Sequence, residues 1–533
     1  MTGPGSHRDS RGRRDEKHRR AALPLALAGV LLLAACAPAT DASWQPAAFP
    51  AARVAVAAFP AALDPATVPS LRGLRIRNDA VGLQARVALL PGQSPVNDRM
   101  IGAVRDAIGG REAATGVGYA PEVQPRGAGL GDRSCVADST RLPAAALLAD
   151  PRLGPAGGTG TAVACDIVTA AGPYLGVRMR TVTGDAAAIT ADTSATLYTD
   201  LRTGETVSAE ALWTAEAGPA LWGDIVEALR RDAGALSLAP VQPPDEAGLA
   251  VIGSALTRSV PQAGTIVIEI PAGFSPPELQ ALGIVATTEP LAVAVPLEVA
   301  TPFLTPFGAG LVGAVASALP FEAPAAVPAG LETIDCELVP CVALTYDDGP
   351  SGFTPAILDE LRARGAAATF YVMGEKARGY ADTLRRMRDE GHEIANHSWN
   401  HPSLPSLTDE QVAAQLRDTS AAIQNVVGER PKSFRPPYGE YNQNVLRIAG
   451  LPAILWDVDT FDYQRPGVDT LLARAVDAPR PGSIVLMHDI HPGTAEAAAA
   501  MYDGLLDRGF SLVTVTQIFE GDLPASGAWT SGR

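Results

Sequence analysis

The chain has 533 residues, of which 47% are apolar and 19% are charged, and its formal net charge is −16. This length allows two or three domains with complete hydrophobic cores, and the composition excludes a wholly disordered chain. The acidic excess argues against nucleic acid or an anionic lipid surface as a partner, because both would be repelled.

Residues 1–36 are predicted to be a targeting segment. A basic tail precedes the apolar stretch Ala21–Ala35, which is too short for a comfortable membrane span. The small residues before Cys36 resemble a bacterial lipobox, which implies that Cys36 is lipidated and becomes the mature N-terminus. A secretory signal with an incidental cysteine is the alternative. Both hypotheses predict export, and the lipobox predicts a membrane lipoprotein that faces the cell wall.

Export makes the remaining four cysteines candidates for disulfides. They form two local pairs, Cys135 with Cys165 and Cys336 with Cys341. An oxidising compartment favours disulfides over a metal cluster. A zinc site with four cysteines is the alternative, and the large gap between the two pairs argues against it.

The region before the last third divides into a tether and an accessory domain. Residues 37–70 are rich in Ala and Pro with little periodicity, which is typical of a flexible tether. Residues 71–319 are predicted to form an α+β domain. Its strand-like runs and its helical pattern lie at residues 74–77, 181–183, 265–270 and 221–236.

One stretch of the accessory domain is more specific. "LYTDLRTGETVSAEALW", residues 197–213, combines a strand, a turn and a short helix entry. It resembles the RsiV-like accessory domain that precedes the catalytic module in some bacterial peptidoglycan deacetylases. Prolines among alanines then predict a linker at residues 320–335.

Residues 336–520 alternate regularly between strand and helix, and residues 521–533 are left as a C-terminal tail. The helix from Thr354 has Pro355 in its first turn and is expected to stop at Gly365. A second helix begins with Thr408 and Gln411 as a capping box. This alternation predicts a parallel sheet in a distorted (β/α) barrel of about seven strands. The expected strands are residues 342–346, 368–372, 393–395, 433–435, 453–458, 484–487 and 511–515.

Five of the seven histidines lie in the last 150 residues, and two of them are four apart in "HSWNHP". His397 and His401 would share one face of a helix, or would converge on one ion in a loop closed by Pro402. With one carboxylate they would make a site with three ligands and open positions. Surface or capping histidines are the alternative for an isolated pair.

This pair is not isolated, because polar groups follow or end several of the predicted strands. In a barrel of parallel strands that end is the face on which active sites assemble. Structural needs alone would not place polar groups at the same end of five strands. The pattern therefore predicts metal-assisted hydrolysis at a site built from Asp347, Asp348, His397, Arg435, Asp459 and His488.

Five sequence motifs, taken in their order along the chain, resemble those of a known family. "TYDDGP", "HSWNH", "RPPYG", "DVDTFDY" and "IVLMHD" have the order and rough spacing of the motifs of the polysaccharide deacetylases, the NodB-homology family or carbohydrate esterase family 4. The resemblance covers about residues 336–520. Five ordered motifs are highly specific, whereas each alone is weak.

The resemblance implies a role for each motif residue. Asp348, His397 and His401 would hold a divalent ion, usually zinc, which polarises the acetyl carbonyl and acidifies its water. Asp347 would be the general base that takes the proton from that water.

The other motifs would complete the site. Arg435 would orient Asp347, and the backbone N–H of Tyr438 would stabilise the oxyanion. His488 would be the general acid. Asp459 would either hold Arg435 or tune the acidity of His488. Leu486 would line the pocket for the acetyl methyl group.

Four residues depart from the family pattern or have no catalytic place in it. Tyr346 replaces the usual Phe, which is conservative. Tyr463 stands where the fourth motif usually ends in Trp. In the family this position belongs to the wall of the substrate groove, so the change puts the substrate preference in doubt more than the catalysis. His392 and His491 match no catalytic position and are expected at a strand end and in a loop.

The sequence therefore predicts a cell-surface lipoprotein that removes N-acetyl groups from amino sugars, with peptidoglycan as the nearest polymer. Deacetylation of chitin oligomers or acetylated xylan is the second hypothesis. A sensor or wall-binding protein with an inactive barrel is the third, and the presence of every expected ligand and proton-transfer residue argues against it. The sequence does not identify any protein partners.

Overall fold

The computed structural model describes residues 53–234, 240–281, 283 and 287–532. The predicted targeting segment, Cys36 and the first part of the predicted tether lie outside these residues, so their assignment stays a prediction. Within the described residues, no helix combines the length and the apolar character that a membrane crossing requires.

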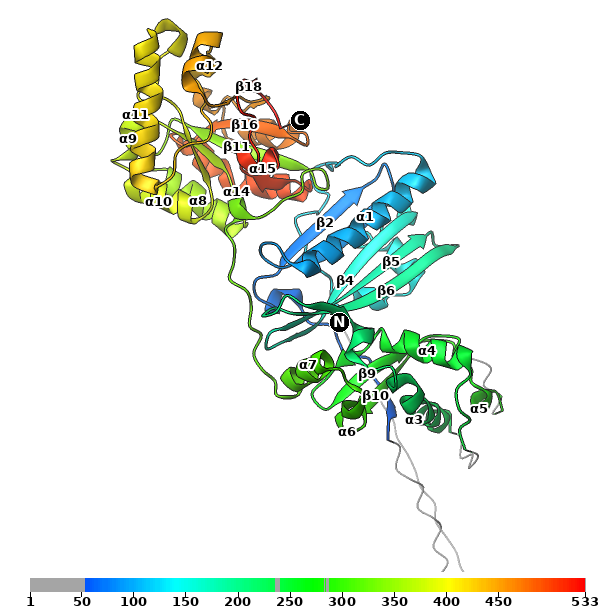
Figure 1. Ribbon diagram of the computed structural model, residues 1–533. Coiled ribbons are helices and arrows are strands. Elements are labelled where there is room, and N and C mark those ends of the chain that lie inside the picture. Colours follow the sequence, from blue (N-terminus) through cyan, green and yellow to red (C-terminus); the bar gives the residue numbers. More distant parts are fainter. Residues whose placement is uncertain (1–52, 235–239, 282, 284–286, 533) are drawn as a thin grey trace, which may run out of the picture. The chain divides into compact units, whose positions relative to one another are not determined.

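A six-stranded sheet forms the first part of the predicted accessory domain. Its strand order is β2-β3-β4-β5-β6-β7, and every neighbouring pair is antiparallel except β3 and β4. Helix α1 (Pro95–Thr115) crosses one face of the sheet and buries Val96, Met100, Val104 and Ile108 at helical spacing (Figure 1). The strands are Arg72–Asn78, Leu83–Leu89, Gly160–Ala171, Tyr174–Gly184, Ile189–Asp200 and Thr206–Ser208.

A four-stranded antiparallel sheet in the order β1-β10-β9-β8 forms the second part. The strands are β1 (Ala55–Ala57), β8 (Val260–Pro261), β9 (Thr265–Ile270) and β10 (Leu291–Pro296). The helices of this part are α3 (Ala217–Asp232), α4 (Glu246–Leu256), α5 (Pro277–Gln280), α6 (Leu297–Ala300) and α7 (Pro306–Ala316).

The structure differs from the predicted tether at its folded end. Ala55–Ala57 pair with β10 as an edge strand, and Leu63 forms an antiparallel bridge with Ile167. The sequence hid this strand because small residues alternate too weakly in hydrophobicity to show a period of two. The proposed tether is therefore structured from residue 55 onward.

The local structure of residues 197–213 matches the expected strand, turn and short helix. These residues form the end of β6, the turn before β7 and a 3-10 helix at Ala209–Leu212. The resemblance of the whole domain to an RsiV-like domain stays a prediction, because a strand and a turn are compatible with many folds.

Both cysteine pairs form disulfides. Cys135 joins Cys165 in β4 with 5.1 Å between Cα atoms, and Cys336 joins Cys341 at the start of β11 with 5.5 Å. Each separation lies in the range that a disulfide requires.

The last part of the chain is a parallel sheet with the order β13-β12-β11-β16-β15, and β17 also pairs with β11. The strands of this sheet are β11 (Cys341–Asp347), β12 (Thr369–Val372), β13 (Glu393–Asn396), β15 (Val458–Asp459), β16 (Ser483–His488) and β17 (Ser511–Val513).

Isolated bridges extend this sheet around a distorted, incompletely closed barrel. Phe434 bridges Asn396 of β13 on one side and Ala453 of β14 (Ala453–Ile454) on the other, both in parallel. β15 pairs with β16, and β14 and β15 are joined by the chain rather than by a strand pairing, so the wall stays open between β14 and β16. The predicted strands at 433–435 and 453–458 are thus reduced to a bridge and to two short strands, which is the distortion.

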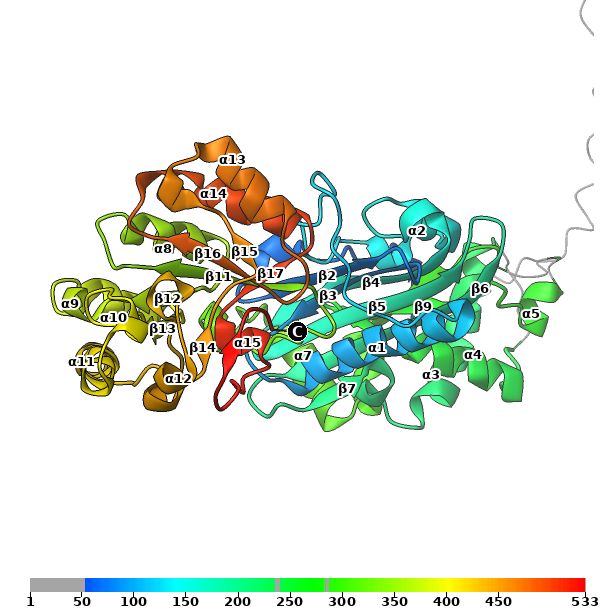
Figure 2. The same ribbon diagram turned by 90° about the horizontal axis from the view of Figure 1, so that it is seen from above.

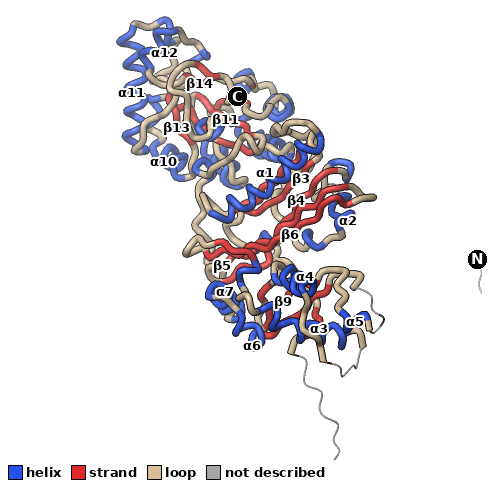
Figure 3. The backbone as a smooth tube through the Cα atoms, turned by 45° about the vertical axis from the view of Figure 1, so that its right-hand side comes forward, coloured by secondary structure: helices blue, strands red, loops and turns tan. Residues whose placement is uncertain are grey.

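Helices surround this barrel (Figure 2), and Figure 3 shows strands β11, β13 and β14 among them. The predicted capping box is confirmed, because Thr408 and Gln411 cap each other's backbone at the start of α11. The helices are α8 (Thr354–Ala363), α9 (Gly374–Ala377), α10 (Ala381–Asp389), α11 (Asp409–Val427), α12 (Gln443–Ala449), α13 (Val468–Leu472), α14 (Pro492–Asp507) and α15 (Val515–Ile518).

The barrel core explains why a tyrosine is tolerated in the first motif. Tyr346 is fully buried, and its ring stacks on Phe370 with 5.1 Å between ring centroids. Its hydroxyl group is paired with the hydroxyl group of Tyr502. The extra polar atom of Tyr346 therefore has a buried partner, which removes the cost of placing it in the core.

Candidate active site

Two neighbouring carboxylates end strand β11 and face the same imidazole. Asp347 is buried and lies between Tyr371 of β12 and His488 of β16 in the sheet register. Asp348 follows with a φ of 68°, a left-handed conformation that turns the chain. His397 Nε2 lies 3.8 Å from Oδ2 of Asp347 and 3.4 Å from Oδ1 of Asp348. The turn thus brings both carboxylates to one site, although adjacent strand residues point to opposite faces.

Asp348, His397 and His401 form a group that can hold a metal ion. His397 follows β13, and His401 lies in the loop beyond it with a φ of 64°. One ligand atom from each of the three residues lies within 4.8 Å of the others. The two imidazoles therefore converge from a loop, which is the second of the two arrangements that their spacing allows.

The donor atoms fit a divalent ion. Oδ1 of Asp348 lies 3.4 Å from Nε2 of His397 and 3.4 Å from Nε2 of His401. Donors that bind one tetrahedral zinc ion at about 2.0–2.2 Å are separated by roughly 3.4 Å. The same Oδ1 atom is buried and has no hydrogen-bond partner in the described part of the chain. A buried acceptor without a partner is costly, and a cation would satisfy it.

Backbone contacts and charge prepare these ligands. The Arg435 carbonyl lies 2.8 Å from Nδ1 of His397, which leaves Nε2 free to face the ion. Burial raises the pKa of the Asp348 carboxyl, but His397 and His401 outweigh burial and lower it overall. Burial and the neighbouring His397 lower the pKa of His401. An ionised aspartate and a neutral histidine are the forms that bind metal.

Arg435 holds Asp347 in place. The guanidinium group is fully buried, and Nη1 donates to Oδ1 of Asp347 at 2.9 Å and to Oγ1 of Thr345 at 2.7 Å. Nε and Nη2 donate to the carbonyls of Ile454 and Leu455, both at 2.8 Å. A planar fork held at several donors fixes the direction of the carboxylate that it contacts.

His488 is held by Asp462, not by Asp459. Oδ1 of Asp462 lies 2.7 Å from Nδ1 of His488, and Oδ2 accepts from the His488 backbone at 2.7 Å. Burial lowers the pKa of His488, but Asp462 outweighs burial and raises it to about 9. Asp462 is buried and also accepts from Thr494, so its own position is fixed.

Of the two roles predicted for Asp459, the structure contradicts the one in which it holds Arg435, whereas its charge does interact with that of His488. Among the described residues, Asp459 is not a hydrogen-bond or ion-pair partner of Arg435, and its Oδ1 instead accepts from the backbone of Phe461. Phe461 has a φ of 52°, so the chain turns there and directs Asp462 towards the site. The third carboxylate of "DVDTFDY" was the only signal in the sequence for Asp462.

The residues predicted to bind substrate lie around this centre. Tyr438 is exposed and its ring centroid lies 4.5 Å from that of His401, while the exposed Tyr463 lies 5.7 Å from His488 by the same measure. Leu486 is buried in β16 opposite Thr345 of β11. One tyrosine therefore stands beside the metal group and the other beside the candidate acid.

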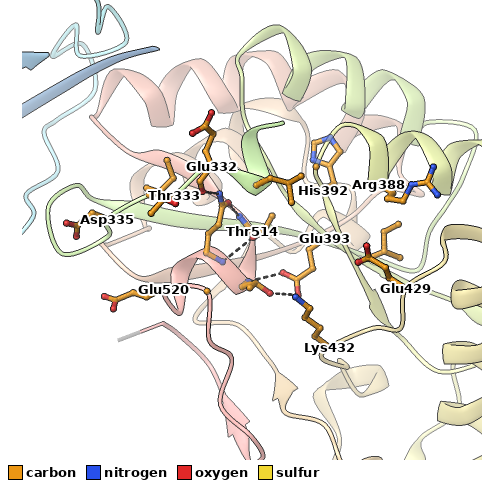
Figure 4. A pocket seen from close by; sticks show the side chains of 18 of the residues that line it. Glu332, Thr333, Asp335, Arg388, His392, Glu393, Glu429, Lys432, Thr514 and Glu520 are labelled. Atoms are coloured by element: carbon orange, nitrogen blue, oxygen red, sulfur yellow. Dashed lines mark hydrogen bonds between the residues drawn. The ribbon is translucent and has the colours of Figure 1, made fainter. Parts of the chain in front are cut away.

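The two remaining histidines have other surroundings. His491 is the residue before helix α14, and its ring centroid lies 5.7 Å from that of His488. His392 is buried just before β13, and burial lowers its pKa to about 4. It lines a cavity of about 720 Å³ whose walls carry both acidic and basic side chains (Figure 4). The described lining of this cavity contains none of the predicted metal or proton-transfer residues.

The fold and the site together define a (β/α) barrel with a candidate divalent-metal centre, a buried carboxylate beside it and a histidine on the neighbouring strand. A polysaccharide deacetylase family model matches residues 336–451. The chain is 37% identical over 196 residues to the chitooligosaccharide deacetylase of Bradyrhizobium sp., covering 33% of this chain and 90% of that protein. The chain belongs to the polysaccharide deacetylase family.

Two further relatives come from cell-wall metabolism. The peptidoglycan-N-acetylmuramic acid deacetylase PdaC of Bacillus subtilis is 39% identical over 34% of this chain and 38% of its own length. The peptidoglycan-N-acetylglucosamine deacetylase of Bacillus cereus is 34% identical over 34% of this chain and 68% of its own. A solved structure of PdaC matches 34% of this chain and 91% of that chain with 38% identity and a TM-score of 0.34. The chain thus spans 38% of the length of the first curated relatives.

Proposed function

We propose that this protein removes N-acetyl groups from amino sugars of a cell-wall polysaccharide, with peptidoglycan as the substrate. The observation that carries the proposal is the convergence of Asp348, His397 and His401 beside Asp347. The imidazole Nε2 atoms lie 3.4 to 3.8 Å from the carboxylate oxygens. The peptidoglycan relatives support the choice of polymer.

Asp347 acts as the general base in this proposal. A divalent ion held by Asp348, His397 and His401, which we propose to be zinc, supplies Lewis acidity that polarises the acetyl carbonyl and acidifies water. Asp347 accepts the proton of the attacking water, and Arg435 keeps the accepting oxygen pointed into the site. The last residue of β11 and the residue that follows it thus perform different tasks.

His488 acts as the general acid. An amine leaves poorly as an anion, so the sugar nitrogen must receive a proton as the C–N bond breaks. Asp462 holds Nδ1 of His488, and the opposite ring nitrogen is then the one that donates. The raised pKa of about 9 keeps this imidazole protonated at neutral pH.

The proposed location is the outer side of the cell membrane. The basic and apolar pattern of residues 1–36 and the position of Cys36 support export and lipid anchoring. A tethered enzyme meets the wall polymer first, which agrees with a peptidoglycan substrate. Mass spectrometry of the mature N-terminus tests the anchor: diacylglycerol on Cys36 supports it, and an unmodified or differently cleaved N-terminus refutes it.

Acetate release from purified peptidoglycan tests the proposed activity. The full-length protein is incubated with peptidoglycan, chitin oligomers and acetylated xylan, with and without a chelator. We expect metal-dependent acetate release that is fastest on peptidoglycan. Faster release from chitin oligomers would favour the alternative that the Bradyrhizobium relative suggests. No release from any polymer, with metal bound, would refute the proposal.

A further inference from the structure

The C-terminal tail, defined here as residues 523–532, adds a strand to the barrel. Strand β18 (Ala528–Trp529) pairs in parallel with β14, so that Ala453 lies opposite Ala528 and Ile454 opposite Trp529. Ala453 N donates to the Gly527 carbonyl at 2.8 Å, and Leu455 N donates to the Trp529 carbonyl at 2.7 Å. These bonds tie the tail to the backbone of residues 453–455.

The tail fills a gap where the barrel wall is open. β16 pairs with β15, whereas β14 belongs to a separate pairing with β18. The tail occupies this place: Ser531 forms an antiparallel bridge with Ser483, and Gly532 N donates to the Gly482 carbonyl at 2.9 Å. The tail thus links β14 to the beginning of β16.

The segment that the tail supports also holds Arg435. The carbonyls of Ile454 and Leu455 accept from Nε and Nη2 of Arg435, whereas Leu455 N donates to the tail. The remaining guanidinium nitrogen, Nη1, donates to Asp347. One continuous chain of hydrogen bonds therefore runs from Trp529 through Leu455 and Arg435 to the carboxylate of Asp347.

We propose that the C-terminal tail is a positioning element for Asp347, acting through Leu455 and Arg435. This inference rests on the proposed function, because it assigns the tail to the same reaction. β14 has only two residues and is otherwise bordered by the single bridge at Phe434. Without the tail, two backbone N–H groups lose their partners, and the carbonyls that hold Arg435 are free to shift.

The backbone of the tail carries the effect. The side chain of Trp529 is 41% exposed, so its own packing is incomplete. Gly532, by contrast, is closely packed: a Cβ atom there would lie 2.9 Å from Ile518 Cγ2 and 3.0 Å from the Ile518 carbonyl oxygen. A larger residue at 532 would therefore displace the end of the tail without removing it.

The expected effect on catalysis follows from geometry. A displacement of about 1 Å in a catalytic group costs up to roughly 100-fold in rate. Arg435 is a rigid fork, so movement at Nε and Nη2 is transmitted to Nη1. We expect removal of the tail to lower kcat by about 10- to 100-fold and to leave KM within about threefold.

The experiment compares the full-length protein with a variant that ends at Asp522, each alone and combined with Arg435→Lys. If the tail acts through Arg435, truncation lowers kcat in the native background but by less than about twofold in the Arg435→Lys background. Gly532→Val tests the same link with an intact tail, and Thr530→Val at an exposed tail position is the matched control. Equal losses in both backgrounds, or no loss on truncation, would overturn the proposal.

A second measurement does not depend on activity. Hydrogen exchange at the Arg435 Nε–H is followed by NMR, because this group donates to Ile454 in the fully buried interior. We expect at least tenfold faster exchange in the truncated and Gly532→Val proteins, with circular dichroism and melting showing that they remain folded. Unchanged exchange refutes the tail's role even if no substrate is found, whereas faster exchange without acetate release refutes only the proposed function.

Discussion

Replacement of Asp462 by asparagine isolates the charge that holds His488 protonated. The substitution keeps the shape of the side chain and removes its negative charge. The pKa of His488 is raised from its ordinary value of 6.5 to about 9, although burial alone lowers it. This difference corresponds to about 3 kcal/mol in favour of the imidazolium.

The variant should therefore titrate below the native value, because burial still lowers the pKa of His488 and only Asp347 and Asp348 remain to raise it. A pKa of about 9 keeps about nine tenths of the native His488 protonated at pH 8, whereas a midpoint at 6.5 would leave less than about one twentieth. A midpoint at 6.5 would thus reduce the fraction of enzyme with a charged acid by roughly 20-fold. The loss of kcat should accordingly grow as the pH rises from 6 to 8.

NMR titration of the imidazole nitrogens in the metal-free protein measures this directly. Asp347 and Asp348 also face His488 and raise its pKa, so a bound cation is expected to lower the midpoint in both proteins. Asp469→Asn, at an exposed aspartate in the first turn of α13, removes the same charge and is the control. A native midpoint below 7, or a midpoint that Asp462→Asn leaves unchanged, would refute the reasoning.

The same pair predicts a dependence of stability on pH. A histidine whose pKa is higher in the folded state stabilises the fold fully below its unfolded value near 6.5. This contribution is lost as the pH rises through about 9. Chemical unfolding should therefore show that Asp462→Asn costs more free energy at pH 6 than at pH 10, by about 3 kcal/mol at most.

The remaining predictions concern the ion, the base and a disulfide. Asp348→Asn should weaken the affinity for zinc, measured by calorimetry, by more than about 100-fold. This is the upper range for residues that only hold the metal ligands in place, and Asp348 is itself a ligand in our proposal. The control Asp382→Asn, at an exposed aspartate, should leave the zinc affinity unchanged. Asp347→Asn should lower kcat by about 100- to 10,000-fold with zinc still bound, and metal loss on this substitution would contradict its role as base. Replacing both Cys135 and Cys165 by alanine should reduce the free energy of unfolding by about 2–4 kcal/mol in denaturant titrations, because the bond closes a loop of 30 residues. Unchanged stability would show that the bond adds nothing to the fold.

Local patterns were enough to predict the elements that frame the site. The apolar run before Asp347, the capping box at Thr408 and the histidine pair in "HSWNH" each depend on neighbours in sequence, and the structure has a strand, a helix and a loop at these places. The order of strands and helices also predicted a parallel barrel, because such units connect in few ways. The ordered motifs predicted which side chains to examine.

The tertiary structure decided which of those side chains contact one another. Asp459 and Asp462 are equivalent to a reader of the sequence, and only the left-handed turn at Phe461 directs Asp462 to His488. The pairing of the tail with the barrel was equally hidden, because the two residues of β18 are too few to show a period, and its partner β14 lies about 75 residues earlier. Sequence alone determined the local elements and the candidate chemistry, since these follow from short-range preferences. The pairing of carboxylates with their partners depends on backbone turns and long-range packing, which only the folded chain supplies.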